Sequence, residues 1–84
     1  MKPIRLTAHA ESYCEDRGFS VREVETAIRE GNWQPAERNR LQCRKEFLYK
    51  SEWLGKYYET KMVKPIFVDE ADEIVVITVY TFYY

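Results

Sequence analysis

Four side chains near the two ends of the chain could act together on a phosphate ester. His9, the only histidine, could move a proton, because imidazole exchanges protons near neutral pH. Arg17 could hold an anion through two parallel hydrogen bonds. Thr78 and Tyr80 are two positions apart in an apolar run, so both side chains point to one face of a strand and could donate hydrogen bonds. These four are the candidate catalytic residues.

One reaction for which the chain offers candidate groups is cleavage of RNA without a metal ion. That reaction needs a base for the 2′-hydroxyl proton, cations for the charge that develops on the phosphate, and an acid for the leaving 5′-oxygen. His9 is the candidate base, and because it is the only histidine, the second group has to be a tyrosine, lysine, arginine or glutamate. Two separated cysteines and one histidine do not complete a zinc site, so neither a metal nor another cofactor is expected.

Basic side chains gather in the middle of the chain, although its net charge is only -1. Residues 38–64 hold eight lysines and arginines against three glutamates, and five aromatic residues are interleaved with them. A basic surface with aromatic side chains can hold the phosphates and stack the bases of a nucleic acid. Arg44, Lys45 and Lys61 are therefore the candidate RNA-binding residues.

Each of these side chains also has an ordinary structural interpretation. His9, near the start of a helix, could be a surface or packing residue, and Arg17 could lie across the helices or pair with a carboxylate. Thr78 and Tyr80 suit a strand by β-propensity alone. The lysines and arginines could solvate the outer face of a sheet. Only the placement of these residues in the folded chain separates the two interpretations.

Two helices are expected to carry His9 and Arg17 and to support the strands. Thr7 is a suitable N-cap for a first helix that stops at Gly18. Ser20 and Glu23 have the spacing of a capping box, which starts a second helix that ends at Gly31. Because the turn between the two helices is very short, they are predicted to form a helical hairpin.

Four strands are expected after the helices, over residues 33–38, 44–50, 57–68 and 74–82. Pro65 cannot donate a hydrogen bond to a ladder, which predicts an edge or a bulge at that position. Residues 69–73 are acidic and fit a turn, and the last strand, apolar on both faces, is expected to be central and covered by the helices. The predicted fold class is α+β, with an N-terminal helical hairpin packed on a four-stranded, mainly antiparallel sheet.

The length of 84 residues suits one compact core, so a single domain over residues 1–84 is expected. The beginning of the chain has no apolar run of the kind that a signal peptide needs. The longest apolar stretch, residues 74–84, is about half as long as a membrane-spanning helix. We therefore expect a cytoplasmic protein with no membrane partner.

The order and spacing of four short motifs resemble a family of small bacterial domains, domain-of-unknown-function family 4258. The motifs are the pair His9-Ala10, the segment Arg17-Gly18-Phe19-Ser20, the second helix at 24–31 and the closing strand at 74–80. This family is similar to the RelE/ParE toxin-like nucleases, which implies a RelE/ParE-like fold. The resemblance also implies that His9, Arg17, Thr78 and Tyr80 surround one cleft, with Arg44 as a further member.

The resemblance implies a metal-independent endoribonuclease of the RelE-like toxin type, which would cleave RNA by 2′-hydroxyl transesterification. RNA and an antitoxin protein would be its partners. Two alternatives stay open. One is a non-catalytic module of the same fold that docks to proteins, as ParE-like relatives do. The other is a small interaction protein whose Phe82, Tyr83 and Tyr84 pair with another copy of the chain or with an antitoxin strand.

Overall fold

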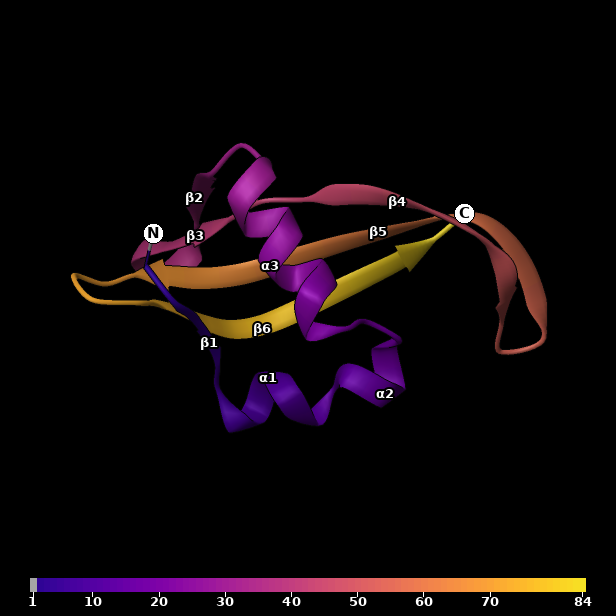
Figure 1. The fold of residues 1–84 in the computed structure, drawn as a ribbon, viewed down its shortest axis with the longest axis horizontal. Coiled ribbons are helices and arrows are strands. Elements are labelled where there is room, and N and C mark those ends of the chain that lie inside the picture. Colours follow the sequence, from indigo (N-terminus) through magenta and orange to yellow (C-terminus); the bar gives the residue numbers. More distant parts are fainter. Residues whose placement is uncertain (1) are drawn as a thin grey trace.

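The computed structural model describes residues 2–84, which form one mixed sheet with three short α-helices on and beside it (Figure 1). The helices are α1 (Ala8–Ser12), α2 (Cys14–Arg17) and α3 (Val21–Glu30), and a 3-10 turn, η1, covers Glu37–Asn39. The strands are β1 (Ile4–Leu6), β2 (Gln34–Ala36), β3 (Arg40–Gln42), β4 (Lys45–Trp53), β5 (Lys56–Asp69) and β6 (Ile74–Tyr83). Their order is β1-β6-β5-β3-β2, and β4 also pairs with β5. β1 runs parallel to β6, and the other pairs are antiparallel.

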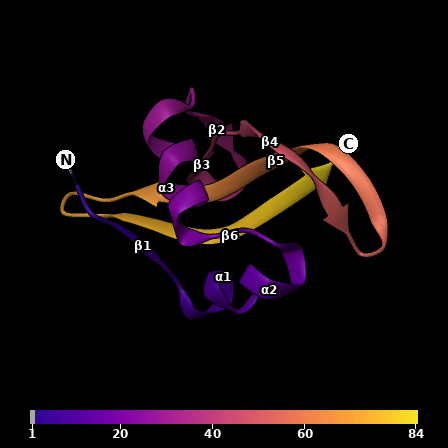
Figure 2. The same ribbon diagram turned by 45° about the vertical axis from the view of Figure 1, so that its right-hand side comes forward.

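The predicted helical hairpin on a four-stranded, mainly antiparallel sheet is wrong, because the chain forms a six-stranded mixed sheet. The first strand, β1, precedes the helices and pairs Ile4 with Ile74 in parallel. The first predicted helix is interrupted at Tyr13, which has a φ of -95° and a ψ of 0°. This residue is the C-cap of α1 and the N-cap of α2. α1 and α2 are therefore two single turns beyond the edge of β6, as Figures 1 and 2 show, and no long helix is left to form a hairpin.

α3 is confirmed together with the capping box that predicts its start. The Ser20 hydroxyl accepts a hydrogen bond from the Glu23 amide at 3.1 Å, and the Glu23 carboxylate accepts one from the Ser20 amide at 2.9 Å. The helix buries Val24, Ala27 and Ile28 against one face of the sheet. Over residues 2–84, no helix is long and apolar enough to cross a membrane.

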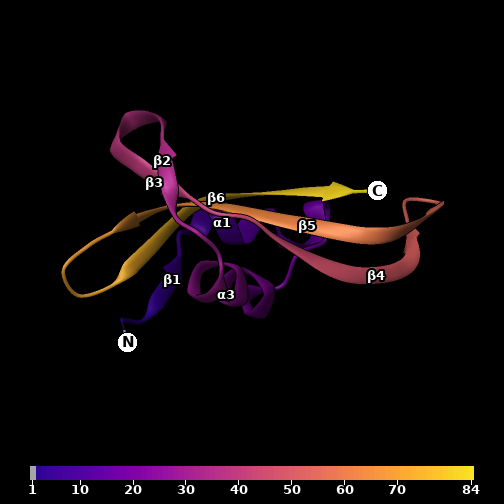
Figure 3. The same cartoon turned by 90° about the horizontal axis from the view of Figure 1, so that it is seen from above.

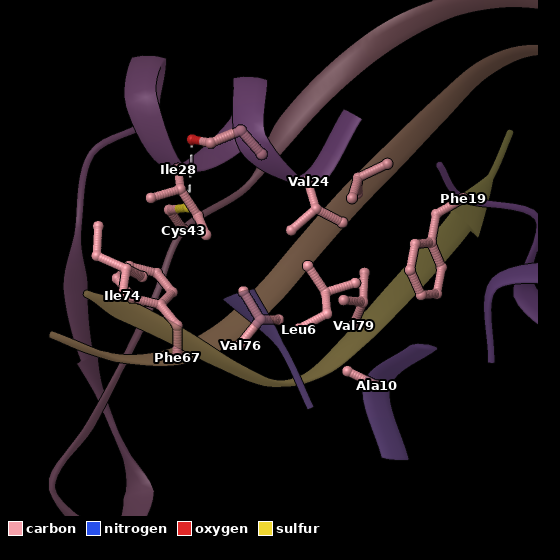
Figure 4. Close-up of a cluster of buried hydrophobic side chains, with 12 residues drawn as sticks. Leu6, Ala10, Phe19, Val24, Ile28, Cys43, Phe67, Ile74, Val76 and Val79 are labelled. Carbon is pink, nitrogen blue, oxygen red and sulfur yellow. Dashed lines mark hydrogen bonds between the residues drawn. The ribbon is translucent and has the colours of Figure 1, made fainter. Parts of the chain in front are cut away.

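The core lies between α3 and the sheet (Figure 4). Phe67 of β5 and Val76 and Val79 of β6 are fully buried there, together with Val24 and Ile28 of the helix. Each of these side chains contributes roughly 1.5–3 kcal/mol by leaving water. Among residues 2–84, no α-helix covers the opposite face of the sheet (Figure 3). The last strand is thus covered by a helix on one side, as the sequence predicts. The predicted central position holds only over residues 74–76, where β1 pairs with β6, and the rest of β6 is an edge strand.

Pro65 lies in the middle of the sheet, so of the two predicted alternatives, an edge or a bulge, the edge is wrong. It pairs with Val79 of β6, and its carbonyl accepts a hydrogen bond from the Cys43 amide at 3.4 Å on the other side. Because the nitrogen and carbonyl of a strand residue point to the same side, the missing N–H of Pro65 faces Cys43, in the gap between β3 and β4. A bulge does follow directly, where the register shifts between Ile66 and Phe67.

Aromatic rings from the C-terminal parts of β4 and β6 and from the N-terminal part of β5 pack together on the helix side of the sheet. The ring of Tyr83 stacks on Trp53, with 5.0 Å between the ring centroids, and also contacts Tyr49 and Tyr58. The Tyr83 hydroxyl donates a hydrogen bond to the carbonyl of Arg17 at 3.0 Å. Burial raises the pKa of Tyr83 to about 12. The fold therefore favours the neutral form of this tyrosine.

We expect this tyrosine to make the fold sensitive to alkali. A group whose pKa is raised by folding stabilises the folded state fully below its unfolded pKa, here 10.0, and ceases to do so as the pH rises through about 12. The free energy of unfolding in urea should therefore decline from pH 10 to 12, and less steeply in Tyr83→Phe. Cys43, whose thiol pKa burial raises to about 11, affects both proteins equally. Parallel pH profiles for the two proteins would contradict this expectation.

Candidate functional site

A hollow of about 640 Å³ lies on the face of the sheet away from α3, and we call it the open-face hollow. Figure 3 shows α3 on one side of the sheet, while β2 and β3 rise on the other side. The hollow is the space between this raised arm and the surface of β5 and β6. Its lining comes from the arm (Pro35, Ala36, Glu37, Arg38, Arg40, Gln42) and from the two long strands (Lys64, Ile66, Thr78, Tyr80). It is therefore polar and rich in cations.

A bulge in β6 brings Thr78 to this face. Ile66 pairs with Thr78 and Phe67 pairs with Val76, so Ile77 is the extra residue between them. Val76 is buried in the core beneath α3, and strict alternation would send Thr78 to the same side. The extra residue reverses that alternation, and β-bulges often re-aim side chains in this way near functional sites.

Arg17 joins Thr78 and Tyr80 at the edge of β6. β1 ends opposite Val76, so the next stretch of β6 has an unpaired edge, and α2 lies beside it. Nη1 of Arg17 donates a hydrogen bond to the Val79 carbonyl at 2.7 Å and one to the Thr78 hydroxyl at 3.4 Å. The guanidinium also lies 5.2 Å from the centroid of the Tyr80 ring. Three of the four predicted catalytic residues are thus in contact.

His9 is placed further along the same edge. It is exposed on α1, and its ring meets Tyr13 edge-on with 5.0 Å between the centroids. The Arg17 guanidinium lies 3.9 Å from the centroid of that Tyr13 ring. Within residues 2–84, no hydrogen bond joins His9 to Thr78 or Tyr80, so the link between them passes through Tyr13 and Arg17. Tyr13 is a site residue that was not predicted, and its spacing of four residues from both His9 and Arg17 was the available signal.

Two of the three predicted RNA-binding residues lie on the helix side of the sheet. Lys45 forms an ion pair with Glu30 of α3 at 3.1 Å. Lys61 is buried and forms an ion pair with Glu23 at 2.8 Å. Both ammonium groups therefore support the packing of α3 and do not face the hollow. Arg44, one residue before Lys45, takes the opposite side by strand alternation and lies on the open face.

The cations that line the hollow are Arg38, Arg40 and Lys64. None of the three forms an ion pair within residues 2–84. Lys64 is the cross-strand partner of Tyr80. An alignment of the two predicted strands could therefore have identified Lys64 as a site residue. Arg38 and Asn39 have φ values of 62° and 61°, a left-handed conformation that asparagine adopts readily and that costs Arg38 roughly 1–2 kcal/mol.

The sequence between the end of β1 and the end of β6 matches one family. Residues 6–81 match a domain of unknown function, DUF4258. The chain belongs to this family. The matched region includes every predicted site residue, from His9 to Tyr80. The DUF4258 description carries no activity, and neither a curated protein nor a solved structure gave a significant match to the chain. Over residues 2–84, no group of three or more His, Cys, Asp or Glu side chains is placed to hold a metal ion.

Proposed function

We propose that this DUF4258 domain is a metal-independent endoribonuclease of the RelE-like type, which binds single-stranded RNA on the open face of its sheet. The observation that supports this most is that cations without ion-pair partners, Arg40 and Lys64, line one hollow with Thr78 and Tyr80. Arg17 contacts both of these last two residues from the edge of β6. A phosphodiester that is attacked by its own 2′-hydroxyl gains negative charge, and cations with hydroxyl donors stabilise that charge.

Arg17 can hydrogen-bond to β6 and bind a phosphate at the same time. Its hydrogen bonds to Val79 and Thr78 both come from Nη1. The guanidinium has five N–H donors in a planar fork, so Nε and Nη2 remain for the oxygens of a phosphate. The contacts with Tyr13 and Tyr80 hold the guanidinium in place at the edge of β6. We therefore assign to Arg17 the stabilisation of the charged transition state.

The proton transfers fall to His9 and Tyr80. In the proposed reaction His9 takes the proton of the 2′-hydroxyl, whose oxygen attacks the neighbouring phosphorus. The bond from phosphorus to the 5′-oxygen breaks, and Tyr80 supplies a proton to that oxygen. The products are a 2′,3′-cyclic phosphate and a free 5′-hydroxyl. An RNA strand that follows the row His9, Tyr13, Arg17 would meet the imidazole and the guanidinium in turn.

A non-catalytic binding module is the second candidate, in which the same fold docks to a partner without cleaving it. The observation that favours it is the separation of His9 from Thr78 and Tyr80 by two intervening side chains. Such a module would keep any affinity of the open face and would release no RNA products. An assay that follows binding and cleavage on the same RNA separates the two candidates.

We expect Lys64→Ala to weaken the binding of single-stranded RNA and to make binding less sensitive to salt. Each lost phosphate contact lowers the slope of log affinity against log salt by about 0.7 for a single strand. Lys45→Ala is the matched control, since it removes a lysine that is paired with Glu30 on the opposite face. The measurement is fluorescence anisotropy of a labelled oligonucleotide over a salt series with chelator present. Equal effects of the two substitutions would contradict a site in the hollow.

A further inference from the structure

Beyond the hollow, the open face of the sheet carries a row of aromatic side chains. Tyr80, Phe82 and Tyr84 are alternate residues, so they share one face of the sheet, and they are 44%, 45% and 54% exposed. Tyr84 follows the end of β6, yet it continues the ladder. Its amide and carbonyl exchange hydrogen bonds with Thr60 of β5 at 3.0 and 2.8 Å. The row therefore has the regular spacing of a strand, roughly 6–7 Å between neighbours.

The Tyr84 side chain reaches across the sheet. Its hydroxyl donates a hydrogen bond to the carboxylate of Glu46, which belongs to β4. β5 lies between the two, since Met62 pairs with Glu46 on one side and with Phe82 on the other. Outer strands of such a triplet are roughly 10 Å apart, so the ring has to lie over β5 to span them. The hydroxyl contact therefore positions the ring over the open face, where the residue is 54% exposed.

The aromatic row begins at the cations of the hollow. Lys64 pairs with Tyr80 across the strands, and Arg44 and Lys64 line a second, smaller hollow next to it. Neither cation has an ion-pair partner within residues 2–84. A ladder of exposed rings that starts beside free cations is complementary to a polymer that carries both anions and flat bases. Single-stranded nucleic acid is that polymer, because its phosphates follow a basic groove while its bases stack on aromatic side chains.

We infer that Tyr80, Phe82 and Tyr84 stack successive bases of a single-stranded RNA whose phosphate lies in the open-face hollow. This inference rests on the proposed function, because the hollow defines where the strand begins. It adds a subsite of two to three bases that runs along β6, away from Thr78. Stacking on ring faces accepts every base, so the subsite selects single strands over duplexes and discriminates weakly among sequences.

The test uses two single-stranded oligonucleotides of equal length and charge, a DNA strand with bases and an abasic DNA strand. Both lack the 2′-hydroxyl, so neither can be cleaved by the proposed reaction. The wild type should prefer the strand with bases by about tenfold or more for each stacked base. Phe82→Leu, which keeps an apolar side chain without a ring, should lose about tenfold on that strand and nothing on the abasic strand. Phe82→Trp should keep the preference, and Lys64→Ala should weaken both complexes.

Several results would overturn the inference in distinguishable ways. Equal affinity of the wild type for the two strands would remove the stacking subsite while leaving the phosphate hollow and the proposed function intact. Binding of neither strand, nor of RNA, would remove the proposed function as well. A dimer in sedimentation that Phe82→Leu converts to a monomer, with no change in oligonucleotide affinity, would assign this face to a second copy of the chain. Leu54→Ala, at an apolar side chain that is 86% exposed and lies outside the row, is the control for nonspecific loss.

Discussion

Gly18→Ala is expected to lower the free energy of unfolding by about 2–5 kcal/mol. Gly18 has a φ of 73°, which a residue with a Cβ adopts at a cost of roughly 1–2 kcal/mol. A Cβ there would also lie 2.3 Å from the Tyr83 hydroxyl oxygen and 2.7 Å from the ring of Trp53. The aromatic cluster would have to shift, and overpacking of this kind costs typically about 1–3 kcal/mol. Urea denaturation followed by circular dichroism measures the loss.

Gly55→Ala is the matched control for this substitution. Gly55 has a φ of 84°, but a Cβ there would have no atom within 4 Å. It should therefore show only the backbone cost of roughly 1–2 kcal/mol. The difference between the two losses in free energy of unfolding measures how closely the ends of β4, β5 and β6 pack against the turn between α2 and α3. If both variants lost the same stability, the close contact of Tyr83 and Trp53 with Gly18 would be contradicted.

His9→Ala is expected to slow RNA cleavage by about 10²–10⁴-fold, the usual contribution of a general base, while RNA affinity stays nearly unchanged. The affinity is preserved because His9 is exposed at the edge of the site and carries no phosphate contact in the proposed complex. A group that acts only in the transition state lowers the rate and leaves ground-state binding alone. Single-turnover cleavage and fluorescence anisotropy on the same labelled RNA measure the two quantities.

Glu11→Ala is the control for His9→Ala, because Glu11 is also exposed on α1. It should cleave RNA at the wild-type rate. Cleavage by His9→Ala at the wild-type rate would withdraw the role of base from His9. In that case the non-catalytic binding module becomes the better account of the open face. A parallel loss of cleavage and affinity would instead show that α1 positions the RNA.

The parts of the fold that could be predicted from the sequence are those with local signals. The capping box of α3 depends on residues three apart, and the apolar run of β6 is continuous along the chain. β1 has no such local signal. Its three residues are too few to show the alternation of apolar and polar side chains of a strand, and its partner β6 lies about 70 residues away. The sequence also gives no local signal for the break between α1 and α2 at Tyr13, because the flanking residues keep helical spacing. These features depend on tertiary pairing, which overrides local propensity.

The site was predicted in part for the same reason. Arg17, Thr78 and Tyr80 were proposed together and lie in contact. The roles of Lys45 and Lys61 could not be assigned from the basic segment, because charge along a chain does not say which face of the sheet a helix covers. Pro65 indicated an edge or a bulge, but the position of the extra residue, Ile77, could not be predicted, because a one-residue insertion in one strand shows only in its register against the next.

The most direct test of the central claim is the identity of the products from a single-stranded RNA with chelator present, beside a DNA strand of the same sequence. The account predicts that the RNA is cut, that one product ends in a 2′,3′-cyclic phosphate and the other begins with a 5′-hydroxyl, and that the DNA stays intact. Intact RNA at protein concentrations that saturate binding would contradict it. Cleavage of both strands, or products with a 5′-phosphate, would contradict it as well, because neither can arise from attack by the 2′-hydroxyl.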